Sequence, residues 1–180
     1  LLAFQQQIKI IQSDIRWMQE RTKCSQAQII AGDARTFATS MAQSVDAVIT
    51  SPPYANNYDY ADALRFEMTF WGDVSGWKDI RESVRKYLIV SSSQHSSRNK
   101  LKCSELVESD AVQSIREELG IVMEELAKVR QTHGGKKHYH TMIGAYCQDI
   151  SLVLRQLRIA CKPGAKMCWV IGDSAPYGVY

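Results

Sequence analysis

Apolar residues recur at steps of three and four at the start of the chain, which is the spacing of one face of an α-helix. This pattern predicts an amphipathic helix over residues 1–21. The same period continues over residues 105–130 and 139–161, and a shorter helical pattern occupies residues 61–71. The apolar face of the first helix consists of Leu1, Phe4, Ile8, Ile11, Ile15 and Met18.

Short runs rich in β-branched residues separate these helical patterns. "AQIIAGD" covers residues 27–33, "VDAVITS" covers 45–51, and "KMCWVIGDS" follows the turn residues "KPG" and covers 166–174. Because strands alternate with helices, we expect a parallel, doubly wound α/β sheet of the Rossmann-like kind, incomplete in this chain.

Residues 72–137 are too long for a simple connection between elements of one sheet, so they are predicted to form a helical, basic insertion. The 180 residues, of which 45% are hydrophobic and 23% charged, otherwise have the composition of one globular domain. We therefore expect residues 1–180 to form part of a single domain that carries this insertion.

Cysteine usage and hydropathy indicate a cytoplasmic protein. The five cysteines form no CxxC pair, and an odd number argues against a disulfide framework. No window approaches eighteen consecutive apolar residues, and the start lacks the pattern of a signal peptide. We expect reduced thiols and no membrane partner.

The stretch "TSPPY" lies directly after the second predicted strand. Ligands of open parallel sheets bind beyond the carboxyl ends of the strands, so we expect Asp33, Ser51 and Asp173 to lie near one another. Pro52 and Pro53 have no N–H and a fixed φ, which makes the chain after the strand stiff.

A stiff turn with free acceptors suits an exocyclic amine. The Ser51 side chain and the Pro52 carbonyl can accept hydrogens from an –NH2 group, while Tyr54 offers a flat face for a base. These residues predict amine alkylation. The simpler alternatives are a surface turn at "SPPY" and a helix cap at Asp33.

"TSPPY" resembles the catalytic motif of the amino-group DNA methyltransferases. The serine form is most similar to enzymes that methylate cytosine N4, rather than adenine N6. The resemblance implies S-adenosylmethionine as methyl donor, a DNA base flipped out of the duplex, and a catalytic motif at Ser51, Pro52, Pro53 and Tyr54.

Other segments extend the resemblance over about half of the chain. "IIAGDAR" matches the strand end that contacts the cofactor adenosine, which implies this role for Asp33 with its neighbours Gly32 and Ala34. "LRIACKPGAKMCWVIGDS" resembles a helix, turn and strand of the family, and "NNYDYADALRFEMTFWG" is similar to a bacterial and archaeal subgroup.

The glycine-rich cofactor loop of that family is absent from the 180 residues. We expect it before Leu1 or, in permuted members, after Tyr180, so the remainder of the domain is a predicted partner as a further segment or chain. The isolated chain is accordingly predicted to bind S-adenosylmethionine weakly.

Basic residues concentrate between Lys78 and Lys102, with serines among them. Such a stretch is often a solvated face, but next to this motif it favours contact with DNA, or with RNA as the alternative. His133, His138 and His140 lack the further ligands of a usual zinc site, so no metal is predicted. The predicted nucleic-acid contacts are Asn56, Asn57, Tyr58, Arg81, Arg85, Lys86 and Arg98.

Two other functions remain open at this point. One is an RNA methylase that acts on the guanine amine of transfer RNA, because that group also uses a Pro-Pro-Tyr motif. The other is a non-catalytic nucleic-acid-binding protein or subunit derived from a methylase. The target sequence, and a restriction-linked or regulatory role, are not determined by these residues.

Overall fold

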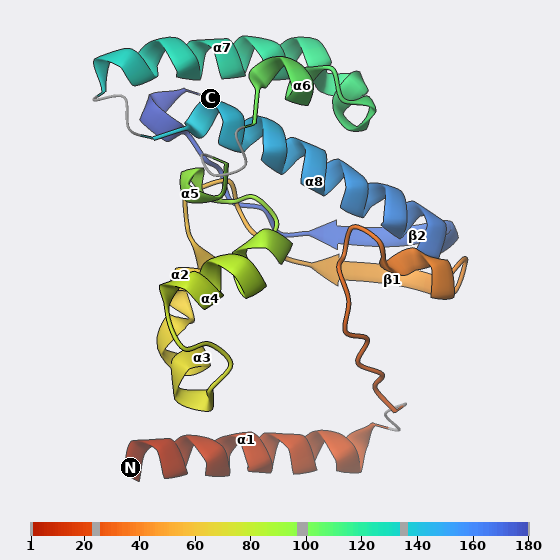
Figure 1. The fold of residues 1–180 in the computed structure, drawn as a ribbon. Helices are drawn as coiled ribbons and strands as arrows, with labels where there is room; N and C mark the ends of the chain where they lie inside the picture. The colour runs from red at the N-terminus through yellow and green to blue at the C-terminus, as the bar shows by residue number, and fades with distance from the viewer. Residues whose placement is uncertain (1, 23–25, 97–100, 134–136, 180) are drawn as a thin grey trace. The chain divides into compact units, whose positions relative to one another are not determined.

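The computed structural model describes residues 2–22, 26–96, 101–133 and 137–179 (Figure 1). The chain divides into two compact units, Leu1–Ala31 and Gly32–Tyr180. In the described residues, no helix is both long and apolar enough to cross a membrane.

The first unit contains helix α1, Leu2–Arg21, which confirms the predicted helix. Its apolar residues are exposed; Phe4, for example, is 68% exposed. The strand predicted at residues 27–33 is wrong, because this segment has no strand structure and Ile29 is 94% exposed. A strand requires hydrogen bonds to a neighbouring strand, and no described segment pairs with these residues.

The second unit contains a two-stranded parallel sheet formed by β1, Val45–Thr50, and β2, Cys161–Trp169. These strands confirm the parallel pairing and two of the predicted strands, although β2 begins before the "KPG" residues. The register shifts opposite Val45–Ala47, where Gly164 takes a φ of +82° that glycine adopts at little cost. The predicted turn is therefore an irregularity inside β2.

Helix α8, Tyr139–Ala160, lies along the sheet, and α7, Arg116–Thr132, packs on the other side of α8 (Figure 1). The prediction of one continuous helix over residues 105–130 is wrong. The segment is divided into α6, Cys103–Val107, a 3-10 turn η4, Asp110–Ile115, and α7. Ser109 interrupts it, because its extended backbone starts a new turn and its Oγ accepts the Ala111 N–H.

The main core lies between α6, α7 and α8. Met123 and Leu126 of α7 pack with Met142 and Ala145 of α8, and all are buried. Burying each of the larger side chains contributes about 1.5 to 3 kcal/mol. Because α7 falls within residues 72–137, this segment shares one core with the rest of the second unit.

Gly144 permits the close packing of α8 on α7. A Cβ at this position would lie 2.8 Å from Met123 Sδ and 3.1 Å from Leu106 Cδ1. We expect Gly144→Val to lower the free energy of unfolding by about 1 to 3 kcal/mol through overpacking, measured by urea denaturation. Gly120→Ala is the control, since a Cβ there would meet only Val107 at 3.9 Å. An equal loss of stability in both variants would contradict this account.

Short helical segments connect β1 to α6. They begin with α2, Tyr60–Ala63, and α3, Arg65–Trp71, which confirm the predicted helical pattern after the "SPPY" turn. Gly72 ends α3 with a φ of +80°. The remaining segments are α4 (Trp77–Asp79), η2 (Ile80–Val84), η3 (Arg85–Tyr87) and α5 (Ser93–Ser96), with η1 (Phe37–Ser40) before β1 and η5 (Pro176–Gly178) after β2.

Candidate functional site

Ser51 begins the turn that follows β1, and its hydroxyl is oriented by β2. The Ser51 Oγ donates a hydrogen bond to the Val170 carbonyl at 3.2 Å and lies 3.0 Å from the Tyr54 hydroxyl. Because the Ser51 hydroxyl hydrogen points at a carbonyl, the Tyr54 hydroxyl donates to Ser51 Oγ, and one lone pair of that oxygen remains as an acceptor. The Ser51 side chain is exposed at this edge of the sheet, so it can accept a hydrogen from a ligand.

Tyr54 packs its ring over Gly172. A Cβ at residue 172 would lie 3.1 Å from Cδ2 and Cε2 of the tyrosine, so the absence of a side chain leaves room for the ring. One step along, the Ser174 hydroxyl donates to the Ala55 carbonyl. The two strand ends that carry Ser51 and residues 170–174 are therefore adjacent, as the sequence predicts.

A small cavity of about 210 Å³ adjoins this turn. Ligand pockets usually measure about 300 to 1,000 Å³, so this space is too small for a complete ligand and is a candidate for part of one. It is lined by Asn56, Asn57, Tyr139, Asp173, Ser174, Ala175 and Pro176.

Asp33 belongs to a different set of contacts. Its carboxylate accepts hydrogen bonds from the Arg35 guanidinium, with Nη2 at 2.7 Å from Oδ2, and from the Arg35 backbone N–H at 2.9 Å. The side-chain hydrogen bond from Arg35 lowers the pKa of Asp33. Arg35 also pairs with Asp149 of α8 at 3.0 Å. No hydrogen bond or ion pair joins Asp33 to Ser51, both of which are described.

A buried cluster of charged side chains lies next to the turn. Arg85 Nη2 is 2.7 Å from Asp59 Oδ2, and His95 Nε2 is 3.3 Å from Asp59 Oδ1. The side chains of Asp59, Arg85 and His95 are 7%, 7% and 2% exposed. Burial alone would raise the pKa of Asp59, but the contacts with His95 and Arg85 outweigh it and lower the pKa to about 2.

The serine-rich segment is attached to the same turn. Asn57, whose φ is +66°, accepts hydrogen bonds through Oδ1 from the Ser93 N–H at 2.9 Å and the Ser93 Oγ at 2.7 Å. The Ser91 hydroxyl donates to the Tyr58 carbonyl at 3.0 Å. Residues 57–59 are therefore held by residues 85–95.

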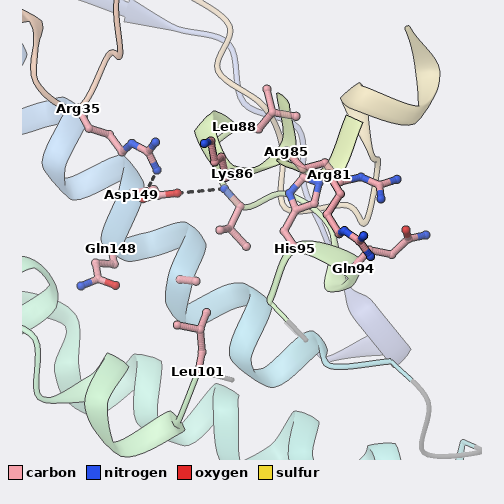
Figure 2. Close-up of a pocket in the computed structure, with 12 residues that line it drawn as sticks. Arg35, Arg81, Arg85, Lys86, Leu88, Gln94, His95, Leu101, Gln148 and Asp149 are labelled. Atoms are coloured by element: carbon pink, nitrogen blue, oxygen red, sulfur yellow. Dashed lines mark hydrogen bonds and ion pairs between the residues drawn. The ribbon is translucent and has the colours of Figure 1, made fainter. Parts of the chain in front are cut away.

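A second cavity, of about 230 Å³, lies between this segment and α8 (Figure 2). Figure 2 shows Asp149 between Arg35 and the backbone of the 85–95 segment, where its Oδ2 accepts the Val90 N–H at 3.0 Å. Carboxylates neutralise Arg35 and Arg85. Among the residues that the structure describes, no carboxylate makes a short contact with the other two lining cations, Arg81 and Lys86. Arg81 is half-exposed, and its Nη2 lies 3.8 Å from Glu82 Oε1, which is too far for a hydrogen bond.

The histidines near the start of α8 lie close together. The rings of His138 and His140 are 5.7 Å apart, and Arg130 Nη2 is 3.4 Å from His138 Nε2. Burial, and next the Arg130 charge, lower the pKa of both histidines. In the described part of the chain, no group of His, Cys, Asp or Glu side chains has the arrangement of a metal site.

Sequence reasoning did not find the Asp59–Arg85–His95 cluster or the link from Arg35 to Asp149. Asp149 carried a signal, because it is the only carboxylate in the sequence of α8. The cluster carried none, since its members are far apart in the sequence. Arg98 lies outside the described residues, whereas Asn56 and Tyr58 are exposed beside the turn.

A parallel sheet with a Ser-Pro-Pro-Tyr turn and polar residues at adjacent carboxyl ends defines an α/β protein with a candidate ligand site at this edge. The chain is 31% identical over 142 residues to the type II methyltransferase M.BsoBI of Geobacillus stearothermophilus. This match covers 73% of the chain and 27% of that protein, so the chain spans about a quarter of its relative. The similarity supports a relationship to type II methyltransferases. No family model and no solved structure matches the chain.

Proposed function

We propose that these residues form part of the catalytic domain of a DNA methyltransferase that modifies the exocyclic amine of a flipped base, with cytosine N4 favoured over adenine N6. The observation that carries this proposal is the orientation of Ser51. Its hydrogen is held by the Val170 carbonyl and it accepts from the Tyr54 hydroxyl, which leaves one lone pair of an exposed side chain for a ligand. The similarity to a type II methyltransferase independently supports methyl transfer.

The turn positions the amine in this mechanism. Ser51 Oγ and the Pro52 carbonyl each accept one N–H of the amine, which directs the nitrogen lone pair away from the turn. S-Adenosylmethionine, when bound, supplies an electrophilic methyl group. As the nitrogen becomes positively charged, both acceptors bind its hydrogens more strongly. The exposure of Ser51 gives the departing proton a route to water.

Asp33 is the described residue best suited to the adenosine half of the methyl donor. Its side chain is 31% exposed. Arg35 donates to both carboxylate oxygens through its backbone N–H, Nε and Nη2, so a cofactor hydroxyl would share or displace one of these hydrogen bonds. Gly32 and Ala34 lie beside Asp33 in the chain. We assign no described residue to the methionine half, so we expect this chain alone to bind S-adenosylmethionine weakly.

The 180-residue chain should bind DNA through Arg81 and Lys86. Each phosphate contact contributes about 0.9 to the slope of log affinity against log salt, so the Arg81→Ala/Lys86→Ala variant should flatten this slope by up to about 1.8. Fluorescence anisotropy with a labelled duplex across a salt series measures the effect. Lys128→Ala, an exposed cation on α7, is the control. An unchanged slope in the double variant would assign these cations to a solvated face.

The proposed chemistry is tested in the full reading frame that encodes these residues. Transfer of a tritiated methyl group from S-adenosylmethionine to duplex DNA is expected, and it should depend on Ser51. Incorporation that is the same with and without an intact Ser51 side chain would refute the proposed role of the turn.

A further inference from the structure

We propose that Asp59, Arg85 and His95 are positioning residues that hold the "SPPY" turn in its active arrangement, an inference that rests on the proposed function. The cluster is joined to the turn through the chain itself. Asp59 lies five residues after Tyr54, and its Oδ1 accepts the Ala61 and Asp62 N–H groups at the start of α2. The carboxylate thus fixes the end of the turn and the beginning of the helix.

Several contacts of the 85–95 segment converge on residues 57–59. Arg85 and His95 hold the Asp59 carboxylate, Ser93 holds the Asn57 amide, and Ser91 holds the Tyr58 carbonyl. Asn57 has a positive φ, which asparagine adopts more readily than most residues. Its side chain is then held by the two hydrogen bonds from Ser93.

The segment is in turn attached to α8. Asp149 accepts the Val90 N–H and pairs with Arg35, so the turn is braced against the longest described helix (Figure 2). At its other end the turn is fixed by Ser51 on Val170 and Tyr54 over Gly172. Without the charged cluster, Asn57 and Tyr58 would keep their hydrogen bonds to Ser93 and Ser91, but the Asp59 carboxylate would lose the contacts that fix it to the 85–95 segment.

Burial and charge explain why a cluster of this composition suits positioning. The carboxylate is almost removed from water, so it is stable as an anion only while a cation faces it. The Arg85 Nε has no hydrogen-bond partner among the described residues, so Nη2 carries the contact with Asp59. A change of one charge should therefore displace the turn rather than be absorbed by other hydrogen bonds.

Two substitutions separate the charge from the cap. Asp59→Asn keeps an acceptor for the Ala61 and Asp62 N–H groups, because asparagine is as good a helix cap as aspartate, but it removes the anion. Arg85→Gln removes the cation. Leu126→Ala is the control, since Leu126 is buried on α7 and its loss destabilises the fold while the side chains of Asp59, Arg85 and His95 stay intact.

The test uses the 180-residue chain with 3-fluorotyrosine placed at Tyr54. Fluorine NMR should show a shifted or broadened Tyr54 resonance in Asp59→Asn and Arg85→Gln, and an unchanged resonance in Leu126→Ala. Hydrogen exchange of the Ser93 amide should accelerate by about tenfold or more in the two charge variants. The Val90 amide, which Asp149 holds, should exchange as before.

An unchanged Tyr54 resonance together with unchanged Ser93 exchange in both charge variants would overturn the proposal. If circular dichroism shows that Arg85→Gln does not fold, the test uses Asp59→Asn together with the double variant Asp59→Asn/Arg85→Gln, which lacks both charges. These measurements use neither DNA nor methyl donor. A failure of the positioning proposal can therefore be distinguished from a failure of the proposed chemistry. In the active full reading frame, Asp59→Asn should lower kcat by about tenfold with little change in KM for DNA.

Discussion

Ser51→Ala is expected to reduce kcat of the protein encoded by the full reading frame by about a hundredfold or more, while KM for DNA changes little. The alanine removes an acceptor whose contact with the amine strengthens as positive charge develops on nitrogen, so the loss falls on the transition state. Deleting a single polar group that stabilises developing charge commonly costs about 10² to 10³ in kcat.

Tyr54 provides a matched comparison in the same turn. Tyr54→Ala should weaken binding of the flipped base by about 1 to 3 kcal/mol, because stacking on the ring is lost. Tyr54→Phe keeps the ring over Gly172 and removes only the hydroxyl that lies 3.0 Å from Ser51, so it should retain most of the activity. Steady-state kinetics with radiolabelled methyl donor measure all three variants. Wild-type rates in both Ser51→Ala and Tyr54→Ala would show that the turn is not catalytic.

Arg85→Gln is expected to lower the free energy of unfolding by about 3 to 5 kcal/mol near neutral pH. Removing one partner of a buried ion pair leaves the other charge without compensation, and Asp59 is only 7% exposed. Urea denaturation followed by circular dichroism measures this change. Arg81→Gln is the control, because Arg81 is half-exposed and its distant pair with Glu82 contributes under about 1 kcal/mol.

The effect of Arg85→Gln should depend on pH in a defined direction. In the folded protein the pKa of Asp59 is about 2, below its ordinary value of 3.8, so its ionised form stabilises the fold above about pH 4. This contribution is lost as the pH falls through 2. In the variant, protonation of Asp59 removes the uncompensated charge, so the difference between the two proteins should shrink between about pH 4 and pH 2. A difference that is constant over this range would exclude Asp59 as its source.

The elements with an unambiguous local pattern were predictable from the sequence. Helix α8 has a long amphipathic period and β1 is a compact run of β-formers, so each forms nearly where its pattern begins and ends. Residues 27–33 have an equally strong pattern but no described neighbour to pair with, and a strand depends on that neighbour. The break at Ser109 depends on one side-chain cap inside an otherwise continuous helical period.

The candidate site shows the same division between local and distant information. Ser51 and Tyr54 could be proposed from the sequence because four adjacent residues carry their chemistry. The residues that hold this turn could not be predicted from the sequence. Ser93 binds Asn57 across 36 residues, and Asp59 contacts Arg85 only after the chain has folded. The basic stretch likewise appeared uniform in sequence, but Arg85 faces inward whereas Arg81 faces solvent.

The most direct measurement is the identity of the methylated nucleoside. DNA is incubated with the protein encoded by the full reading frame and with S-adenosylmethionine, and transfer RNA is treated in parallel. Both nucleic acids are then digested to nucleosides and analysed by mass spectrometry. The account predicts N4-methylcytosine in the DNA, which is absent when Ser51→Ala replaces the wild type. A methylated guanine in the transfer RNA, or no methylated nucleoside in either nucleic acid, would contradict it.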